Sequence, residues 1–214
     1  MRVIDLTHTI NEEMPVYPGT EAPRLQVVST HERDHFQESR MTMYTHTGTH
    51  VDPPIHVFAG RATLDAFPPE QFIGQALVID CRSVGEGNAV TMAQLLPYGE
   101  KLRQADFLLF LLGWDKKWGT DAYFGSYPCI DDGVLEFIMA GSYKGIGVDT
   151  ISIDPVTGPG IPRHRKLFGE KDIIVIENLR NLDQCGSDLF WFSCFPLKLE
   201  NCDGSPTRAV AWFA

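Results

Sequence analysis

Residues 46–56 read HTGTHVDPPIH, and this stretch restricts the local fold more than any other in the chain. The segment that contains its first half, residues 41–52, is rich in Thr, Tyr and Val, which favours an extended strand. Alternate residues of a strand share one face. The pattern therefore predicts that His46, His50 and Asp52 lie side by side on one face of a strand.

A helix is the competing arrangement for these residues. It would also bring His46 and His50 together, at positions i and i+4, but it would turn Asp52 away from them. The Thr-rich sequence and the Pro-Pro pair at 53–54 disfavour a helix. In the strand, Gly48 stands between the histidines and leaves the space above that face open.

The donor groups of this face are those of a metal site. Two imidazoles and one carboxylate suit divalent ions such as Zn²⁺, Mn²⁺, Fe²⁺ and Ni²⁺, and three protein ligands leave a position for water. The competing interpretation is a solvated strand face whose polar side chains satisfy one another. His56 follows the rigid Pro-Pro turn, and we expect it to be a fourth ligand or a nearby acid–base group.

Charge and hydropathy exclude several partners. The formal net charge of −10, from 28 acidic and 18 basic residues, disfavours nucleic acid and anionic lipid. The N-terminal MRVIDLTHTI lacks the apolar core of a signal peptide, and the longest purely apolar run, residues 107–112, is far shorter than the roughly 20 residues that span a bilayer. We therefore expect a soluble, cytoplasmic protein.

The five cysteines form an odd set without a C-x-x-C pair, which predicts free, mostly buried thiols.

The 214 residues contain no repeat or linker, so one domain over residues 1–214 is expected. Apolar, β-branched runs predict more strands than helices, which is typical of a mixed α/β (α+β) domain. Helices are predicted at 131–141 and at 91–96. Strands are predicted at residues 76–81, 106–112, 145–149, 172–176, 190–199 and 208–213, with Pro196 at an edge or a bulge.

Two further pairs of polar residues carry weaker signals. His31 and His35 stand in a polar setting that indicates an exposed loop or turn. Asp149 and Asp154 flank a predicted strand. We expect these carboxylates to stabilise turns or to hydrogen-bond to neighbouring side chains rather than to react.

The string HTGTHVDPPIH resembles the signature H-x-G-T-H-x-D-x-P-x-H of the putative cyclase family, metal-dependent hydrolases that include bacterial kynurenine formamidase and isatin hydrolase. The likeness covers nearly the full chain. It extends to DLTHTI (5–10), MPVYPGT (14–20), GVDTISID (147–154), IENLRNLD (176–183) and PLKLENCDGSPTRAVA (196–211).

The resemblance implies a fold and a first metal site. The implied fold is the swivelling β/β/α type, a curved mixed sheet with peripheral helices, and the implied assembly is a homodimer or a higher homo-oligomer. By motif match, His46, His50 and Asp52 become ligands of one divalent ion, with Zn²⁺ the first choice and Mn²⁺ the second. His56 becomes the residue that transfers a proton.

The resemblance also implies a second site in formamidase-like members. There Asp52 bridges to another ion, whose remaining ligands correspond to His164 and Glu177 in this sequence. In isatin-hydrolase-like members the site resembles one that holds a single metal ion, so one or two ions per chain are expected. From the residues alone, His164 in PRHRK is equally consistent with a solvated basic loop, and Arg180 is an alternative partner for Glu177.

These features predict metal-assisted hydrolysis of a small-molecule amide, either a formamide or a cyclic amide, because a bound divalent ion activates water near neutral pH and polarises a carbonyl. Tyr17 corresponds to a family segment that lines the substrate pocket, although Thr20 replaces the acidic residue of many relatives. Two alternatives remain: an Fe(II) oxygenase that uses two histidines and one carboxylate, and a non-catalytic metal-binding protein.

Overall fold

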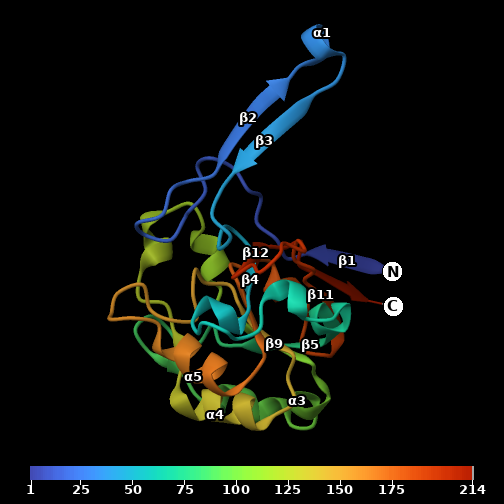
Figure 1. Cartoon of the computed structure of the whole chain (residues 1–214). Helices are drawn as coiled ribbons and strands as arrows, with labels where there is room; N and C mark the ends of the chain where they lie inside the picture. The colour runs from blue at the N-terminus through green and yellow to red at the C-terminus, as the bar shows by residue number, and fades with distance from the viewer. Residues whose placement is uncertain (214) are drawn as a thin grey trace.

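The structure is a computed structural model that describes residues 1–213, and its centre is one curled mixed sheet of nine strands (Figure 1). β1 and β13 lie at one edge, so the two ends of the chain run side by side. In spatial order the strands are β1 (Arg2–Asp5), β13 (Val210–Phe213), β11 (Phe190–Ser193), β5 (Ile73–Asp80), β7 (Phe107–Leu111), β9 (Gly145–Val148), β10 (Ile174–Glu177), β4 (His50–Asp52) and β12 (Ser205–Pro206).

Four parallel strands, β5, β7, β9 and β10, form the middle of the sheet. Parallel strands covered on both faces read as continuous apolar runs, and all five residues of β7, FLLFL, are buried. Along β5 the side chains alternate between two hydrophobic clusters. Leu77 and Ile79 join the cluster that includes the helices, whereas Ala76 and Val78 join the cluster on the opposite face.

The helices are short, and most of them pack on one face. α4 (Asp132–Ala140) begins where Asp131 accepts a hydrogen bond from the backbone N–H of Val134, and it ends at Gly141. The others are α1 (His31–Asp34), α2 (Met92–Leu95), α3 (Lys101–Gln104) and α5 (Pro162–Glu170). The 3-10 turns are η1 (Pro54–His56), η2 (Leu64–Ala66), η3 (Pro69–Phe72), η4 (Leu96–Tyr98), η5 (Trp114–Lys117), η6 (Asp121–Phe124) and η7 (Leu182–Gln184).

A two-stranded hairpin projects from the body of the protein (Figure 1). It consists of β2 (Arg24–Ser29) and β3 (Glu38–Thr42), and α1 lies at its tip. Every residue of β3 is exposed. A second small pair, β6 (Ala89–Val90) and β8 (Cys129–Ile130), is parallel. His31 opens α1 and His35 follows it, both exposed as the sequence predicted, although part of the segment is helical.

The prediction of one strand over residues 41–52 is wrong. β3 ends at Thr42 and pairs with β2, and β4 contains only His50–Asp52. Between them the chain is irregular, and Gly48 has a φ of 66°, in the left-handed region that an extended strand excludes. This conformation turns the Gly48 carbonyl toward the Asn178 side-chain amide, which donates to it at 2.8 Å.

Most of the other expectations from the sequence are confirmed. Each predicted strand outside 41–52 contains or overlaps an observed one, and the fold is the mixed α/β type with a curled sheet. Pro196 forms an isolated bridge beyond the end of β11. The five cysteines are free, and four are buried. Among the described residues, no helix combines the length and the apolar character needed to cross a bilayer.

Candidate metal centre

The pairing of β4 with β10 brings together acidic and imidazole side chains that are far apart in the sequence. These strands are antiparallel, with His50 opposite Glu177 and Asp52 opposite Val175. Residues directly opposite each other project to the same face. Because Val175 packs in the hydrophobic cluster that contains the α5 residues, His50, Asp52 and Glu177 also face α5.

His164 approaches His50, Asp52 and Glu177 from the first turn of α5. Its side chain is buried, which corrects the alternative of a solvated basic loop. Asp154 accepts hydrogen bonds from the backbone N–H groups of Arg163 and His164, and its Oδ2 lies 2.8 Å from His164 Nδ1. With Nδ1 donating to Asp154, Nε2 keeps its lone pair. That Nε2 lies 3.3 Å from Glu177 Oε1 and 3.5 Å from Asp52 Oδ2, and it has no hydrogen-bond partner.

The three residues of the HTGTHVD motif converge as well, although His46 lies outside the strand. His46 Nδ1 is 2.6 Å and His50 Nε2 is 3.2 Å from Asp52 Oδ1. His50 Nδ1 lies 2.7 Å from the Gly48 carbonyl, and donation to that oxygen leaves Nε2 free to bind a metal. The left-handed turn at Gly48, rather than strand alternation, therefore brings the two histidines together.

Two groups of potential ligands thus share one carboxylate. His46, His50 and Asp52 form the first group, and Asp52, His164 and Glu177 form the second, with the ligand atoms of each group within 4.8 Å of one another. Asp52 offers Oδ1 to the first group and Oδ2 to the second. Neutral nitrogen and anionic oxygen donors fit a divalent ion of the Zn²⁺ or Mn²⁺ kind, and the partnerless Nε2 of His164 supports this assignment.

Glu177 is held in place by contacts that do not involve Arg180. The backbone N–H of Ile153 donates to Glu177 Oε1 at 2.9 Å, and Oε2 lies 3.5 Å from His50 Nε2. Among the described residues, no ion pair joins Arg180 to Glu177. From the sequence, the partner of Glu177 was either a metal ion or Arg180. In the structure its carboxylate faces His50 and His164.

The titration behaviour of the cluster reflects its mixture of carboxylates and imidazoles. Burial opposes ionisation of Asp52, but His50 and His46 outweigh burial and hold its pKa well below the ordinary value. Burial also opposes the charging of His50 and His164, yet the neighbouring carboxylates raise the pKa of both rings. His56 is different, because burial lowers its pKa below the usual 6.5. Its imidazole is therefore neutral at neutral pH.

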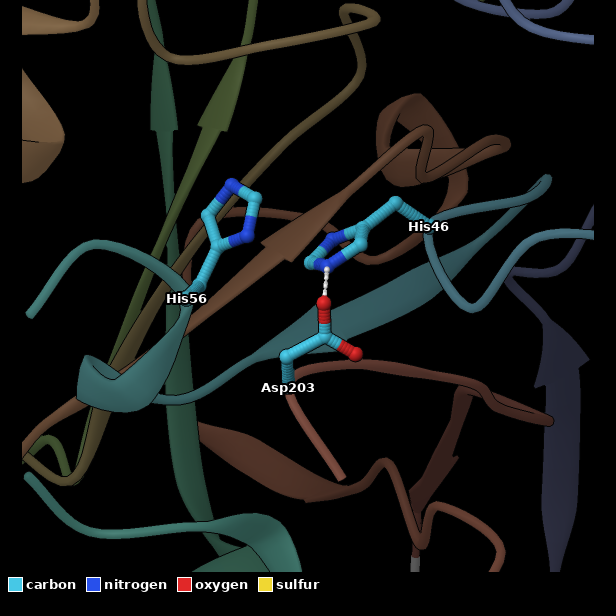
Figure 2. A group of neighbouring side chains, drawn as sticks. All are labelled: His46, His56 and Asp203. Atoms are coloured by element: carbon cyan, nitrogen blue, oxygen red, sulfur yellow. Dashed lines mark ion pairs between the residues drawn. The ribbon is translucent and has the colours of Figure 1, made fainter. Parts of the chain in front are cut away.

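His56 lies beside the cluster, at the end of η1. Its ring centroid is 4.0 Å from that of His46 and 5.8 Å from that of His164. It belongs to neither group that shares Asp52, but its side chain and that of Asp203 flank His46 (Figure 2). The position agrees with a group that acts on a substrate next to the ligands.

A cavity of about 320 Å³ opens onto these residues. His46, His50, His56, His164 and Glu177 line its polar end. The other lining residues are apolar or uncharged, and they include Tyr17, which the family resemblance assigned to the substrate pocket: Pro15, Val16, Tyr17, Thr20, Tyr44, Gly48, Ile151, Ser152, Ile161 and Asn178. The cavity has the size and the predominantly apolar lining of a small-molecule site.

Several residues that support the site were not singled out from the sequence. Asn178, with a φ of 57°, accepts a hydrogen bond from Thr49 through its carbonyl and donates to Gly48. Asp203 faces His46 and carried no spacing signal.

Asp154 and Asp149 have the supporting roles that were expected from the sequence. Asp154 contacts His164, and Asp149 accepts hydrogen bonds from the backbone N–H groups of residues 112–114.

Comparisons with known proteins identify relatives of the chain. The family model described as "Putative cyclase" matches residues 4–155. The chain belongs to this cyclase family. It is 28% identical over 218 residues to the kynurenine formamidase of Polaromonas naphthalenivorans, an alignment that covers 98% of this chain and 90% of the relative. Kynurenine formamidase and isatin hydrolase, the activities for which its relatives are named, are both hydrolases.

Solved structures of cyclase relatives share the fold. Isatin hydrolase A from Labrenzia aggregata superposes with a TM-score of 0.86 at 26% identity, covering 98% of this chain and 93% of the other. A protein from Bacillus stearothermophilus, described as a predicted metal-dependent hydrolase, superposes with a TM-score of 0.80 at 26% identity, covering 98% and 97%. The fold implied by the sequence resemblance is therefore confirmed.

The geometry predicts the metal content of ligand variants. We expect the purified chain to retain about two divalent ions, one for each group that shares Asp52. His164→Ala removes a ligand of the second group only, so we expect about one ion, and His50→Ala weakens the first group. Elemental analysis after desalting gives the ratio of ions to chains, with circular dichroism as the check on folding. His31→Ala, at the exposed hairpin tip, is the matched control. Equal metal content in all four proteins would contradict the assignment.

Proposed function

We propose that this chain is a cytoplasmic, metal-dependent hydrolase that cleaves the carbon–nitrogen bond of a formamide or a cyclic amide. The single observation that carries the proposal is the pair of ligand groups sharing Asp52 at the polar end of an otherwise uncharged cavity. The hydrolase relatives support the same chemistry.

The donor set favours Zn²⁺, with Mn²⁺ as the second choice, and we propose two ions per chain. When bound, such ions lower the pKa of a coordinated water and polarise the substrate carbonyl. The chain's own residues fix the ligand geometry. The Gly48 carbonyl and Asp154 each engage Nδ1 of one ligand histidine, which directs the Nε2 atoms of His50 and His164 toward Asp52.

His56 is the proposed proton-transfer residue. Its neutral imidazole lies beside His46 on the cavity side, outside both groups that share Asp52. A ring nitrogen there can accept a proton from the attacking water and deliver it to the leaving nitrogen of the amide. The lowered pKa keeps the basic form available at neutral pH.

The cavity lining also limits the charge and polarity of the substrate that we propose. Apart from the ligand residues and His56, no lining residue carries a formal charge. A free α-carboxylate or ammonium group would therefore lose water without gaining an ionic partner. We propose that the part of the substrate away from the reacting bond is neutral and largely apolar.

The arrangement favours a hydrolase over the two alternatives. An Fe(II) oxygenase centre needs three protein ligands around one ion, whereas here the second oxygen of Asp52 faces a second ligand group. A structural zinc site is closed by four protein ligands and has no need of a cavity, but these ligands line one.

Hydrolysis of neutral amides tests the proposal. We expect the metal-loaded chain to hydrolyse an N-formyl anilide or a cyclic amide such as an isatin, measured as loss of amide absorbance. Removal of metal by a chelator should abolish turnover, and added Zn²⁺ or Mn²⁺ should restore it. Turnover should continue without oxygen. Oxygen consumption dependent on Fe(II), or turnover unaffected by metal removal, would contradict a metal-dependent hydrolase.

Replacement of His56 tests its assigned role. We expect His56→Ala to lower kcat about 10²–10⁴-fold, the usual scale for a lost acid–base group, with metal content unchanged. Because burial lowers the His56 pKa below 6.5, the parent's kcat/KM should fall as pH drops through that lowered value and the imidazole becomes protonated. The variant should lack this fall when metal saturation is confirmed at each pH. A loss of metal as complete as in His50→Ala would make His56 a ligand instead.

We also propose that a second copy of the chain covers the projecting hairpin. An isolated two-stranded hairpin is marginally stable in water, yet this one exposes Leu25, Val27, Phe36 and Met41. Light scattering coupled to size exclusion should give a mass of at least twice 24.0 kDa. Val27→Lys together with Met41→Lys should reduce that mass, while a monomeric parent would contradict the proposal.

A further inference from the structure

His46 is the least enclosed of the three histidine ligands. Its side chain is 23% exposed, compared with 3% for His50 and 3% for His164. His50 lies on a strand and His164 on a helix, but His46 lies in the irregular segment 43–49. Regular backbone structure therefore does not fix its ring.

The other two ligand histidines show how a ring is held. His50 Nδ1 lies 2.7 Å from the Gly48 carbonyl, and His164 Nδ1 lies 2.8 Å from Asp154 Oδ2. In metal sites the nitrogen that does not bind the ion usually donates to such an acceptor, which fixes the tautomer and the ring orientation.

His46 has the opposite orientation. Its Nδ1 faces Asp52 Oδ1 at 2.6 Å, so when Nδ1 binds the metal, the proton is on Nε2. This buried Nε2 has no hydrogen-bond partner within bonding geometry, and the carboxylate that faces it is Asp203 Oδ2 at 3.5 Å (Figure 2). A small movement on metal binding would close this distance to that of a hydrogen bond.

The segment around Asp203 is built against the His46 ring. Thr45 Oγ1, from the residue before His46, donates to Asp203 Oδ1 at 3.0 Å. At Gly204 an added Cβ would lie 2.6 Å from His46 Cε1 and 2.7 Å from Nε2, closer than any side chain could approach. Gly204 therefore lets the backbone pack directly against the imidazole.

We propose that Asp203 and Gly204 position His46 for metal binding, with Asp203 accepting a hydrogen bond from the Nε2–H group and the Gly204 backbone supporting the ring. Both residues act through His46 and neither binds the metal. This role rests on the proposed metal centre. It also gives a function to the C-terminal CDGSP segment, which the sequence left unassigned.

A competing arrangement uses the same side chains. Ligand atoms of His46, His56 and Asp203 also lie within 4.8 Å of one another, so Asp203 could itself hold an ion. That arrangement would bind metal through His46 Nε2 rather than Nδ1. The side chain of Asp203 is 53% exposed, whereas that of Asp52 is 1% exposed, and the half-open position favours an orienting acceptor over a third ion.

Zinc affinity of the full chain is the test, measured by competition with a chromogenic chelator. We expect Asp203→Ala to weaken zinc binding at one of the two sites about 10–100-fold. This is the usual effect of removing the hydrogen-bond acceptor of a ligand histidine. Asp203→Asn keeps an acceptor oxygen and should fall between Asp203→Ala and the parent. Gly204→Ala should weaken zinc binding as well, because its Cβ displaces the ring.

Asp65→Asn is the matched control. Asp65, in η2, accepts the backbone N–H of Asn201 through Oδ1 at 3.1 Å, so this change alters a carboxylate that contacts the Asp203 loop without touching His46. Its zinc affinity should equal that of the parent. Circular dichroism confirms that each variant is folded.

Nitrogen-15 chemical shifts of His46 in the zinc-loaded chain distinguish positioning from a general effect on structure. The parent should show metal-bound Nδ1 and protonated Nε2, and Asp203→Ala should show faster exchange of the Nε2 proton with water. Parental zinc affinity in Asp203→Ala, or zinc on Nε2, would overturn the inference while leaving the metal centre intact. A parent chain that binds no zinc would overturn both.

Discussion

The carboxylate of Asp52 is the group on which the rest of the site depends. It is buried, and its two oxygens face different sets of side chains, Oδ1 toward His46 and His50 and Oδ2 toward His164. A buried charge is tolerated only when it is paired or binds a metal. The surrounding structure therefore brings imidazoles from three segments of the chain to the carboxylate of Asp52.

Long-range pairing achieves this convergence. β4 is only three residues long, and its position is fixed by β10 on one side and β12 on the other. Asn178, at the end of β10, bonds to the segment that precedes β4 and so holds the turn at Gly48. The candidate ligands His50, Asp52 and Glu177 thus lie near the edge of a sheet whose strands β7, β9 and β10 are buried, which gives a rigid support to a site that must keep its geometry.

The sequence predicted the members of the first ligand group because their spacing is local, but it did not predict how they converge. Gly48 adopts its left-handed conformation with the help of Asn178, which is 130 residues away in the chain, so strand periodicity gave the wrong local structure. The same limit applies to His164. Its helix begins where Asp154 accepts two backbone N–H groups, a contact that the sequence does not reveal.

Some local signals of α5 were nonetheless present. Pro162 stands at the first helical turn, and the buried residues His164, Leu167 and Phe168 follow i, i+3, i+4 spacing. Asp203 had no such signal, because it reaches His46 from the far end of the chain. The central sheet was predicted well, since fully buried parallel strands leave uninterrupted apolar runs in the sequence.

The central claim is that Asp52 bridges two metal ions. Crystals of the metal-loaded chain, measured on both sides of the absorption edge of the bound metal, would locate every ion directly by anomalous scattering. The account predicts two peaks, one beside Asp52 Oδ1 within reach of His46 and His50, and one beside Oδ2 within reach of His164 and Glu177. A single peak, or peaks that leave either oxygen of Asp52 without a metal, would contradict it.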